Sequence, residues 1–136
     1  QYWLMNSEPD VYSIEDLERD GSTCWEGVRN YKARNNMQAM KIGDRGFFYH
    51  SRSGLEIVGI VEVCAVAHPD STTDDDRWDC VDIKAVRPFE TPVTLEQIKA
   101  EPRLKDMVLV NNSRLSVQPV TDAEWRIVCS MGNTAP

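Results

Sequence analysis

The sequence predicts a single α+β domain whose core is a strongly bent β-sheet or a small β-barrel. Several short runs combine β-branched and aromatic residues, as strands do, and Gly, Pro and acidic residues separate them. Short helices begin at capping boxes between these runs, without the regular strand–helix alternation of a parallel sheet. With 136 residues, of which 41% are hydrophobic, the chain can bury one core and is too short for two. We therefore expect one domain over residues 1–136.

The expected strands share a high content of aliphatic and aromatic side chains. They are residues 2–5, 46–50, 57–67, 80–86, 108–110 and 113–120. Gly59 is expected to mark a bulge or a bend in the longest of them. Two prolines predict a turn over residues 88–92, and residues 23–30 are expected to be irregular.

The expected helices are identified by their first residues. Ser13, Thr94 and Thr121 are each followed three residues later by an acidic residue or Gln, which predicts a capping box at each position. A further helix is expected over residues 31–40, where small and apolar residues fall on one stripe, with Gly43 placed to end it.

The most informative segment is WEGVRNYKARNNMQAM, residues 25–40. The formal net charge is −7, yet the chain from Gly27 to Gly43 holds four cations and no acid. This segment also contains Trp25, Tyr31 and three Asn residues. Cations, flat rings and amides on one short segment suit a site that meets phosphate and a nucleobase together.

Several other kinds of site are disfavoured. The sequence has no P-loop, no G-x-G-x-x-G and no G-x-S-x-G, and we expect no cofactor. The four cysteines and two histidines do not fall at zinc-finger spacing, so we expect free thiols, no metal and an intracellular protein, cytoplasmic in a bacterium or nuclear in a eukaryote. The start lacks signal-peptide features, and no apolar run approaches the ~18 residues of a membrane span. The acidic loop of residues 70–82 is expected to be solvated rather than to bind calcium.

The four tryptophans divide into different expected roles. Trp3 and Trp125 are expected in the core, and Trp78 could be buried or exposed. Trp25 lies in a polar, irregular segment, which favours a stacking surface over packing. Two polar clusters are further candidates. Residues 6–8 could contact a base edge, although spacing alone favours a strand-ending turn, and residues 113–116 could hold a phosphate or equally form a polar edge strand.

The segments YWLMNSEP, WEGVRNYKARNNMQAM, GDRGFFYHS, IVGIVEV and SRLSVQPV resemble, in this order and over essentially the whole chain, the EVE domain family. The resemblance implies a PUA-like fold, a small bent β-barrel surrounded by short helices, related to the YTH domains that read methylated adenine in RNA. It also implies a non-catalytic reader of a modified base, 5-methyl- or 5-hydroxymethylcytosine in DNA, that holds the base in an aromatic cage.

The resemblance assigns site residues to two groups. The base-binding group is Trp25, Asn6, Ser7, Glu8, Asn30, Tyr31, His50 and Ser51. The backbone-binding group is Arg29, Lys32, Arg34, Ser113 and Arg114. Asn6 departs from the family, which usually has Lys there, and the loss of a cation weakens attraction to phosphate.

Two alternatives remain open. Some PUA-like relatives are hydrolases, and an enzyme acting on a modified nucleoside or RNA base could use Glu8, Lys32 and His50 as acid–base groups. A protein-binding role has only the acidic surface in its favour. The expected partner is a nucleic acid carrying a modified base, DNA rather than RNA, with no membrane partner, and the expected state is a monomer.

Overall fold

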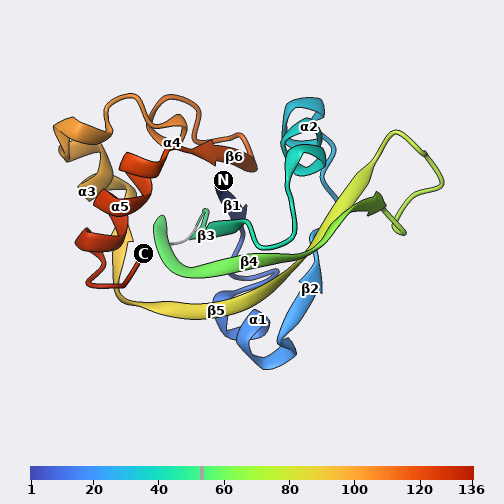
Figure 1. The fold of residues 1–136 in the computed structure, drawn as a ribbon, viewed down its shortest axis with the longest axis horizontal. Coiled ribbons are helices and arrows are strands. Elements are labelled where there is room, and N and C mark those ends of the chain that lie inside the picture. Colours follow the sequence, from blue (N-terminus) through green and yellow to red (C-terminus); the bar gives the residue numbers. More distant parts are fainter. Residues whose placement is uncertain (53) are drawn as a thin grey trace.

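A six-stranded mixed sheet forms the centre of the computed structural model, which describes residues 1–52 and 54–136 (Figure 1). The strand order is β2-β5-β4-β3-β1-β6. The strands are β1 Tyr2–Ser7, β2 Ser22–Cys24, β3 Arg45–His50, β4 Glu56–Pro69, β5 Asp79–Thr94 and β6 Val117–Val120. The helices are α1 Ile14–Asp20, α2 Tyr31–Ala39, α3 Leu95–Ala100, α4 Val108–Asn111 and α5 Asp122–Met131, with a 3-10 turn, η1, at Pro102–Leu104.

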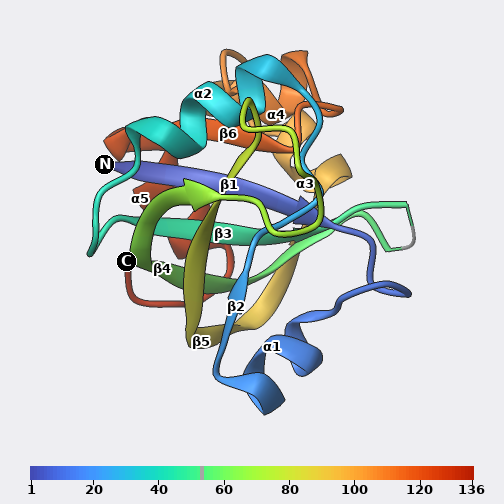
Figure 2. The ribbon, with the colours of Figure 1, turned by 90° about the vertical axis from the view of Figure 1, so that its right-hand side faces the viewer.

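The sheet is antiparallel except at β1, which pairs in parallel with β3 and antiparallel with β6. The long strands β4 and β5 bend together around the core, as Figures 1 and 2 show, and their pairing contains several register shifts. One shift adjoins Gly59, where an added Cβ would lie 2.9 Å from Ile14 and 3.1 Å from the carbonyl oxygen of Arg87. The predicted α+β class, the bent sheet and the irregularity at Gly59 are confirmed.

Two hydrophobic clusters fill the domain. One holds Trp3, Trp25, Phe48 and the buried side chains of α1 and α2. The other is built around Trp125 and the apolar faces of α3, α4 and α5, which gather at one end of the sheet (Figure 1). Trp3 and Trp125 are 4% and 0% exposed, which confirms their predicted place in the core.

The helix starts follow the sequence closely. Ser13, Thr94 and Thr121 each form the predicted capping box, with both reciprocal hydrogen bonds present. The helix α2 begins as predicted and buries Ala33 and Met37, but it ends at Ala39, before the turn that contains Gly43.

Four local predictions are wrong. Residues 88–92 lie within β5, at a register shift between the pairs Gly59–Pro88 and Ile57–Val93 and beyond the part of β5 that pairs with β2, so the two prolines interrupt no regular ladder. Residues 108–110 form helix α4, which packs Leu109 into the second cluster, so tertiary burial overrides β-propensity. Residues 23 and 24, which were expected to be irregular, belong to the strand β2 (residues 22–24). The strand expected over residues 113–120 is β6, which begins only at Val117.

In the described ranges 1–52 and 54–136, no helix combines the length and the apolar character that crossing a bilayer requires.

Candidate nucleic-acid interface

A cleft of about 570 Å³ opens where the end of β1, the end of β2 and the segment that follows β2 come together. The β1 end contributes Asn6, Ser7 and Glu8, and the segment after β2 contributes residues 25–29. Ser116 closes the third side, just before β6. The structure therefore brings together five of the predicted site residues, which are Asn6, Ser7, Glu8, Trp25 and Arg29.

The other predicted site residues do not line this cleft. They are Asn30, Tyr31, Lys32, Arg34, His50, Ser51, Ser113 and Arg114. Of the three acid–base candidates for an enzyme, the cleft contains only Glu8, whose carboxylate lies 3.5 Å from the guanidinium of Arg52. The structure therefore does not assemble these three groups at the cleft.

Trp25 belongs to the core and to the cleft at once. Its side chain is 8% exposed, and its ring meets Phe48 edge-on at a centroid distance of 5.7 Å. Its backbone N–H donates to the carbonyl oxygen of Val81 at 2.7 Å, which continues the pairing of β2 with β5. Residues 25–30 have no regular secondary structure, as predicted, but the preference for a stacking surface over packing is wrong for the Trp25 ring, which strand pairing and the Phe48 contact hold in the cleft wall.

The end of β1 presents polar groups that backbone contacts hold in place. The amide nitrogen of the Asn6 side chain donates to the carbonyl oxygen of Ser113 at 3.3 Å, and the hydroxyl of Ser7 donates to the carbonyl oxygen of Tyr12 at 2.6 Å. Among the described residues, the buried side-chain oxygen of Asn6 has no hydrogen-bond partner. Asn6 therefore lines the cleft with an unsatisfied acceptor that is itself buried.

The acidic loop does not lie wholly in solvent, because Asp70 is 2% exposed. One carboxylate oxygen accepts from the backbone N–H of Gly27 at 2.9 Å and from Arg29 at 3.0 Å. The other accepts from the backbone N–H and the hydroxyl of Thr72 at 2.8 and 2.6 Å. Burial raises the pKa of Asp70, but these hydrogen bonds outweigh it and hold the pKa well below its usual range.

This contact changes the role expected for Arg29. Its guanidinium is paired with Asp70 in the cleft wall and lies over the ring of Trp78 at 5.6 Å. Asp70 therefore neutralises part of the positive charge of Arg29 that the sequence analysis assigned to phosphate binding. Asp70 instead ties the acidic loop to the segment that carries Trp25.

An exposed aromatic surface lies outside the cleft, at the start of α2. Tyr31 is 50% exposed and stacks on Trp78 with the ring centroids 4.9 Å apart. Arg34 lies over the outer ring at 4.9 Å, and Arg77 donates to the Tyr31 hydroxyl at 3.2 Å. Trp78, whose position the sequence left open, is 9% exposed.

Two predicted base contacts instead support the scaffold. His50 is 8% exposed, and its Nε2 accepts from the backbone N–H of Ile14 at 3.1 Å. Burial lowers the pKa of His50, so the ring is neutral near pH 7 and fixes the start of α1. Asn30 accepts from the backbone N–H of Ala33 and caps α2.

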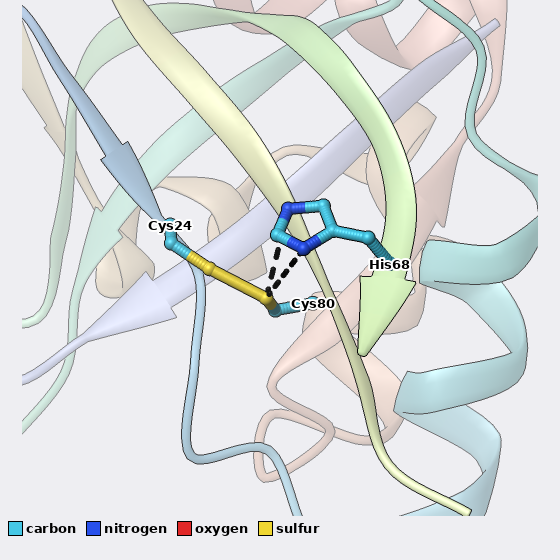
Figure 3. A group of neighbouring side chains, drawn as sticks. All are labelled: Cys24, His68 and Cys80. Atoms are coloured by element: carbon cyan, nitrogen blue, oxygen red, sulfur yellow. Dashed lines mark hydrogen bonds between the residues drawn. A yellow bond between two sulfur atoms is a disulfide. The ribbon is translucent and has the colours of Figure 1, made fainter. Parts of the chain in front are cut away.

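The sequence missed two features of the cleft wall. Tyr12 lines the cleft, and burial together with its hydrogen bond to Asp20 raises the pKa of its phenol, so it remains protonated. Cys24 also lines the cleft and is bonded to Cys80 in a disulfide, where the sequence predicted free thiols (Figure 3). The two cysteines are 56 positions apart, and the pairing of β2 with β5 brings them together.

The disulfide lies beside His68, and these three side chains offer ligand atoms within 4.8 Å of one another, although sequence spacing disfavoured a metal site. Cys64 and Cys129 remain free among the described residues.

The bent six-stranded sheet has the architecture of a PUA-like domain. The EVE domain family model matches residues 1–131, and the chain belongs to this family.

Relatives match over nearly the whole chain. Mouse thymocyte nuclear protein 1 is 37% identical, over 99% of this chain and 75% of that protein. A crystal structure of a protein from Agrobacterium tumefaciens is 58% identical with a TM-score of 0.97, covering 98% of this chain and 94% of that one. The structure of human THYN1 in complex with DNA containing 5-methylcytosine is 36% identical with a TM-score of 0.92, covering 99% of both chains.

A YTH domain from Zygosaccharomyces rouxii superposes with a TM-score of 0.62 at 15% identity, covering 96% of this chain and 85% of that one. This likeness shows that the two proteins share a fold.

Proposed function

We propose that this EVE domain is a non-catalytic reader of a modified base, 5-methylcytosine in DNA, which it takes into the cleft between β1 and the Trp25 segment. The observation that carries the proposal is the meeting of Trp25 with the polar end of β1 in one cleft, in a chain similar to a human protein solved with 5-methylcytosine DNA. A base inside a duplex cannot reach such a cleft, so the target base is flipped out or single-stranded.

Trp25 and Tyr12 are the aromatic residues of the cleft lining, and we assign them to the walls that stack on the base. Stacking on an aromatic side chain contributes about 1–3 kcal/mol per base. The methyl group of 5-methylcytosine adds apolar surface, worth about 0.8 kcal/mol when fully buried. Val11 and Val28 are the apolar lining residues that can contact it.

The polar end of β1 supplies the hydrogen bonds that distinguish one base from another. The unpartnered oxygen of Asn6 and the carboxylate of Glu8 are acceptors, and the exocyclic amine of cytosine is a donor. An acceptor-lined site rejects a base whose edge presents a carbonyl at the same place, because two acceptors then face each other.

The exposed surface of Tyr31 and Arg34 has a separate role in this proposal. It lies outside the base cleft, and Arg29 connects the two through its contact with Trp78. A ring that is half exposed and has a cation over it suits stacking and phosphate contact with the flanking nucleotide. Contacts of this kind do not depend on the modification of the flipped base.

The test is fluorescence anisotropy with short labelled single strands that differ only in one cytosine or 5-methylcytosine. The wild-type protein is expected to bind the methylated strand more tightly. Trp25→Ala is expected to weaken binding between about fivefold and about a hundredfold, the range that one stacking contact gives, and to reduce the preference for the methyl group. Equal affinity of the wild type for both strands would contradict the proposal.

Two matched variants control this experiment. Tyr31→Ala removes an aromatic ring outside the cleft, and it is expected to weaken binding to both strands equally and leave their ratio unchanged. Trp25→Phe keeps an aromatic wall, so it separates loss of stacking from loss of core packing. Thermal melting of each variant identifies those that remain folded at the assay temperature.

A further inference from the structure

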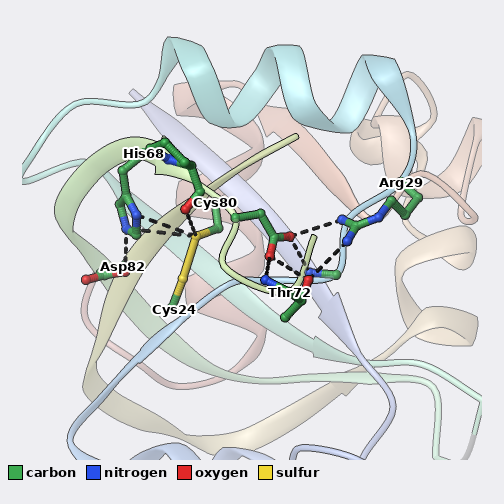
Figure 4. Close-up of a disulfide and its surroundings, with 9 residues drawn as sticks. Cys24, Arg29, His68, Thr72, Cys80 and Asp82 are labelled. Atoms are coloured by element: carbon green, nitrogen blue, oxygen red, sulfur yellow. Dashed lines mark hydrogen bonds and ion pairs between the residues drawn. A yellow bond between two sulfur atoms is a disulfide. The ribbon is translucent and has the colours of Figure 1, made fainter. Parts of the chain in front are cut away.

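Four side chains from three strands meet beside the cleft. Cys24 ends β2, His68 lies near the end of β4, and Cys80 and Asp82 lie at the start of β5 (Figure 4). The Sγ of Cys80 lies 3.8 Å from Nδ1 and 3.9 Å from Nε2 of His68, and Nε2 lies 2.9 Å from a carboxylate oxygen of Asp82. The proposed base site does not include His68, Cys80 or Asp82.

We propose that Cys24–Cys80 is a redox-active disulfide, in which Cys24 is the sulfur attacked by an incoming thiolate and Cys80 is the leaving sulfur. The two sulfurs differ in accessibility. Cys24 is half-buried and lines the cleft, whereas Cys80 is 0% exposed. A small dithiol can therefore approach from the cleft and reach Cys24 but not Cys80.

The leaving sulfur has a proton donor beside it. His68 is 41% exposed at the side chain and can exchange protons with solvent, while Asp82 holds its ring by a hydrogen bond. Protonation of the departing thiolate by the imidazolium removes negative charge from a fully buried position. The carbonyl oxygen of Pro69, 4.0 Å away, can then accept from the new Cys80 thiol.

The exchange is balanced with a dithiol reductant of the thioredoxin or dithiothreitol class. One reductant thiolate forms a mixed disulfide with Cys24 and releases Cys80, which takes a proton from His68. The second reductant thiol, as its thiolate, attacks the mixed disulfide and releases Cys24 as a thiolate, which takes a proton from solvent in the cleft, and solvent also returns a proton to His68. The reductant loses two electrons and two protons and becomes a disulfide, and the protein gains two electrons and, through solvent, two protons.

The cross-link lies where it can affect base binding. Cys24 immediately precedes Trp25, and the disulfide joins the short strand β2 to β5. After reduction, β2 keeps its backbone pairing over three residues and the flanking hydrogen bonds from Trp25 to Val81 and from Ala85 to Gly21, but it loses its covalent link to β5. We expect the reduced protein to hold the Trp25 wall less rigidly and to bind the modified base more weakly, a consequence that rests on the proposed function.

Counting thiols in the wild-type protein tests the disulfide itself. The native protein is equilibrated with oxidised and reduced dithiothreitol in varying ratios, acid-quenched, and alkylated with N-ethylmaleimide in denaturant for mass spectrometry. Two adducts are expected on the oxidised protein, from Cys64 and Cys129, and four on the reduced protein, with reduction complete in the absence of denaturant. Four adducts at every ratio, or two adducts under excess reduced dithiothreitol, would overturn the proposal.

The role of His68 is tested with His68→Gln, which can keep a hydrogen bond to Asp82 but cannot donate a proton as an imidazolium does. The expected result is reduction by dithiothreitol at least about tenfold slower than in the wild type, at the lower end of what a positioned general acid contributes. An unchanged rate in a variant that melts like the wild type would remove His68 from the mechanism.

Cys24, His68 and Cys80 could instead bind a metal ion, and metal titration of the reduced protein distinguishes the two possibilities. Titration of the reduced protein with Zn²⁺ is expected to give no stoichiometric uptake. Uptake of one equivalent that oxidised dithiothreitol fails to expel would overturn the redox assignment in favour of a metal site. Thiol counting requires no oligonucleotide, so loss of base binding in both redox states would refute the proposed function and leave this inference standing.

Discussion

Replacing Asp70 by Asn tests whether the acidic loop is a structural part of the cleft. The substitution keeps the size of the side chain and removes its charge. The amide of the variant can take two orientations. In one, its NH₂ group replaces the Asp70 oxygen that accepts from Gly27 and Arg29. In the other, the NH₂ group replaces the oxygen that accepts from Thr72. The first orientation loses two hydrogen bonds, whereas the second loses the one from the Thr72 backbone N–H, because the Thr72 hydroxyl can accept from the NH₂ group. In both orientations a buried donor faces a donor, and the remaining hydrogen bonds no longer involve a charged group.

The expected loss follows from these contacts. Each hydrogen bond to a charged group contributes about 1.5 kcal/mol at the lower end of the usual range, and a neutral one about 0.5 kcal/mol less. Losing one of the four bonds and weakening the other three therefore lowers the free energy of unfolding by about 3 kcal/mol. Arg29 is 40% exposed at its side chain and is rehydrated after the change, which argues for this lower end. In a domain of 136 residues, a loss of this size lowers Tm by about 10 °C.

Urea unfolding at pH 7 measures the loss, and Asp74→Asn is the matched control, since Asp74 is an exposed residue of the same loop. The control is expected to change stability by less than about 0.5 kcal/mol. A loss below about 1 kcal/mol for Asp70→Asn would refute the view that the four contacts stabilise the loop.

The pH dependence of the same two proteins gives an independent check. The folded pKa of Asp70 is depressed, so its stabilisation is present above the unfolded pKa of about 3.9 and is lost as pH falls below that value toward the folded pKa. Wild type and Asp70→Asn are therefore expected to converge in stability as the pH falls below about 4. A constant difference between pH 7 and pH 3 would contradict this reasoning.

Three further predictions concern the rest of the domain. Gly132→Ala would place a Cβ 2.4 Å from a ring carbon of Phe89, and calorimetry is expected to show a loss of about 1–3 kcal/mol from overpacking, whereas unchanged melting would show that the ring moves freely. Thr121→Ala removes a capping hydrogen bond and is expected to cost about 1 kcal/mol in urea unfolding, with Thr121→Ser as the control that retains the bond. Native alkylation is expected to modify the half-buried Cys64 before Cys129, which is 1% exposed and whose pKa burial raises to about 11, and the reverse order in peptide mapping would argue against this burial.

The Trp25 side of the cleft shows how far sequence reasoning reached. The resemblance to the EVE family groups residues 6–8, Trp25 and Arg29 in one site, and in the structure these residues line one cleft. It also placed His50 and Asn30 at the base, but the structure uses one to fix α1 and the other to cap α2. Residue type alone does not separate these roles, because the same polar atoms can serve a ligand or the backbone.

The sequence by itself determined the local elements of this protein. Capping boxes depend on residues three positions apart, and the stripe of α2 depends on residues three or four apart, so both are readable without a fold. Only the tertiary structure decided the continuation of β5 through residues 88–92, the burial of Asp70 against Gly27 and the joining of Cys24 to Cys80. Each of these depends on which strand or loop lies opposite, and pairing across 43 or 56 positions is set by the packing of the whole sheet rather than by neighbouring residues.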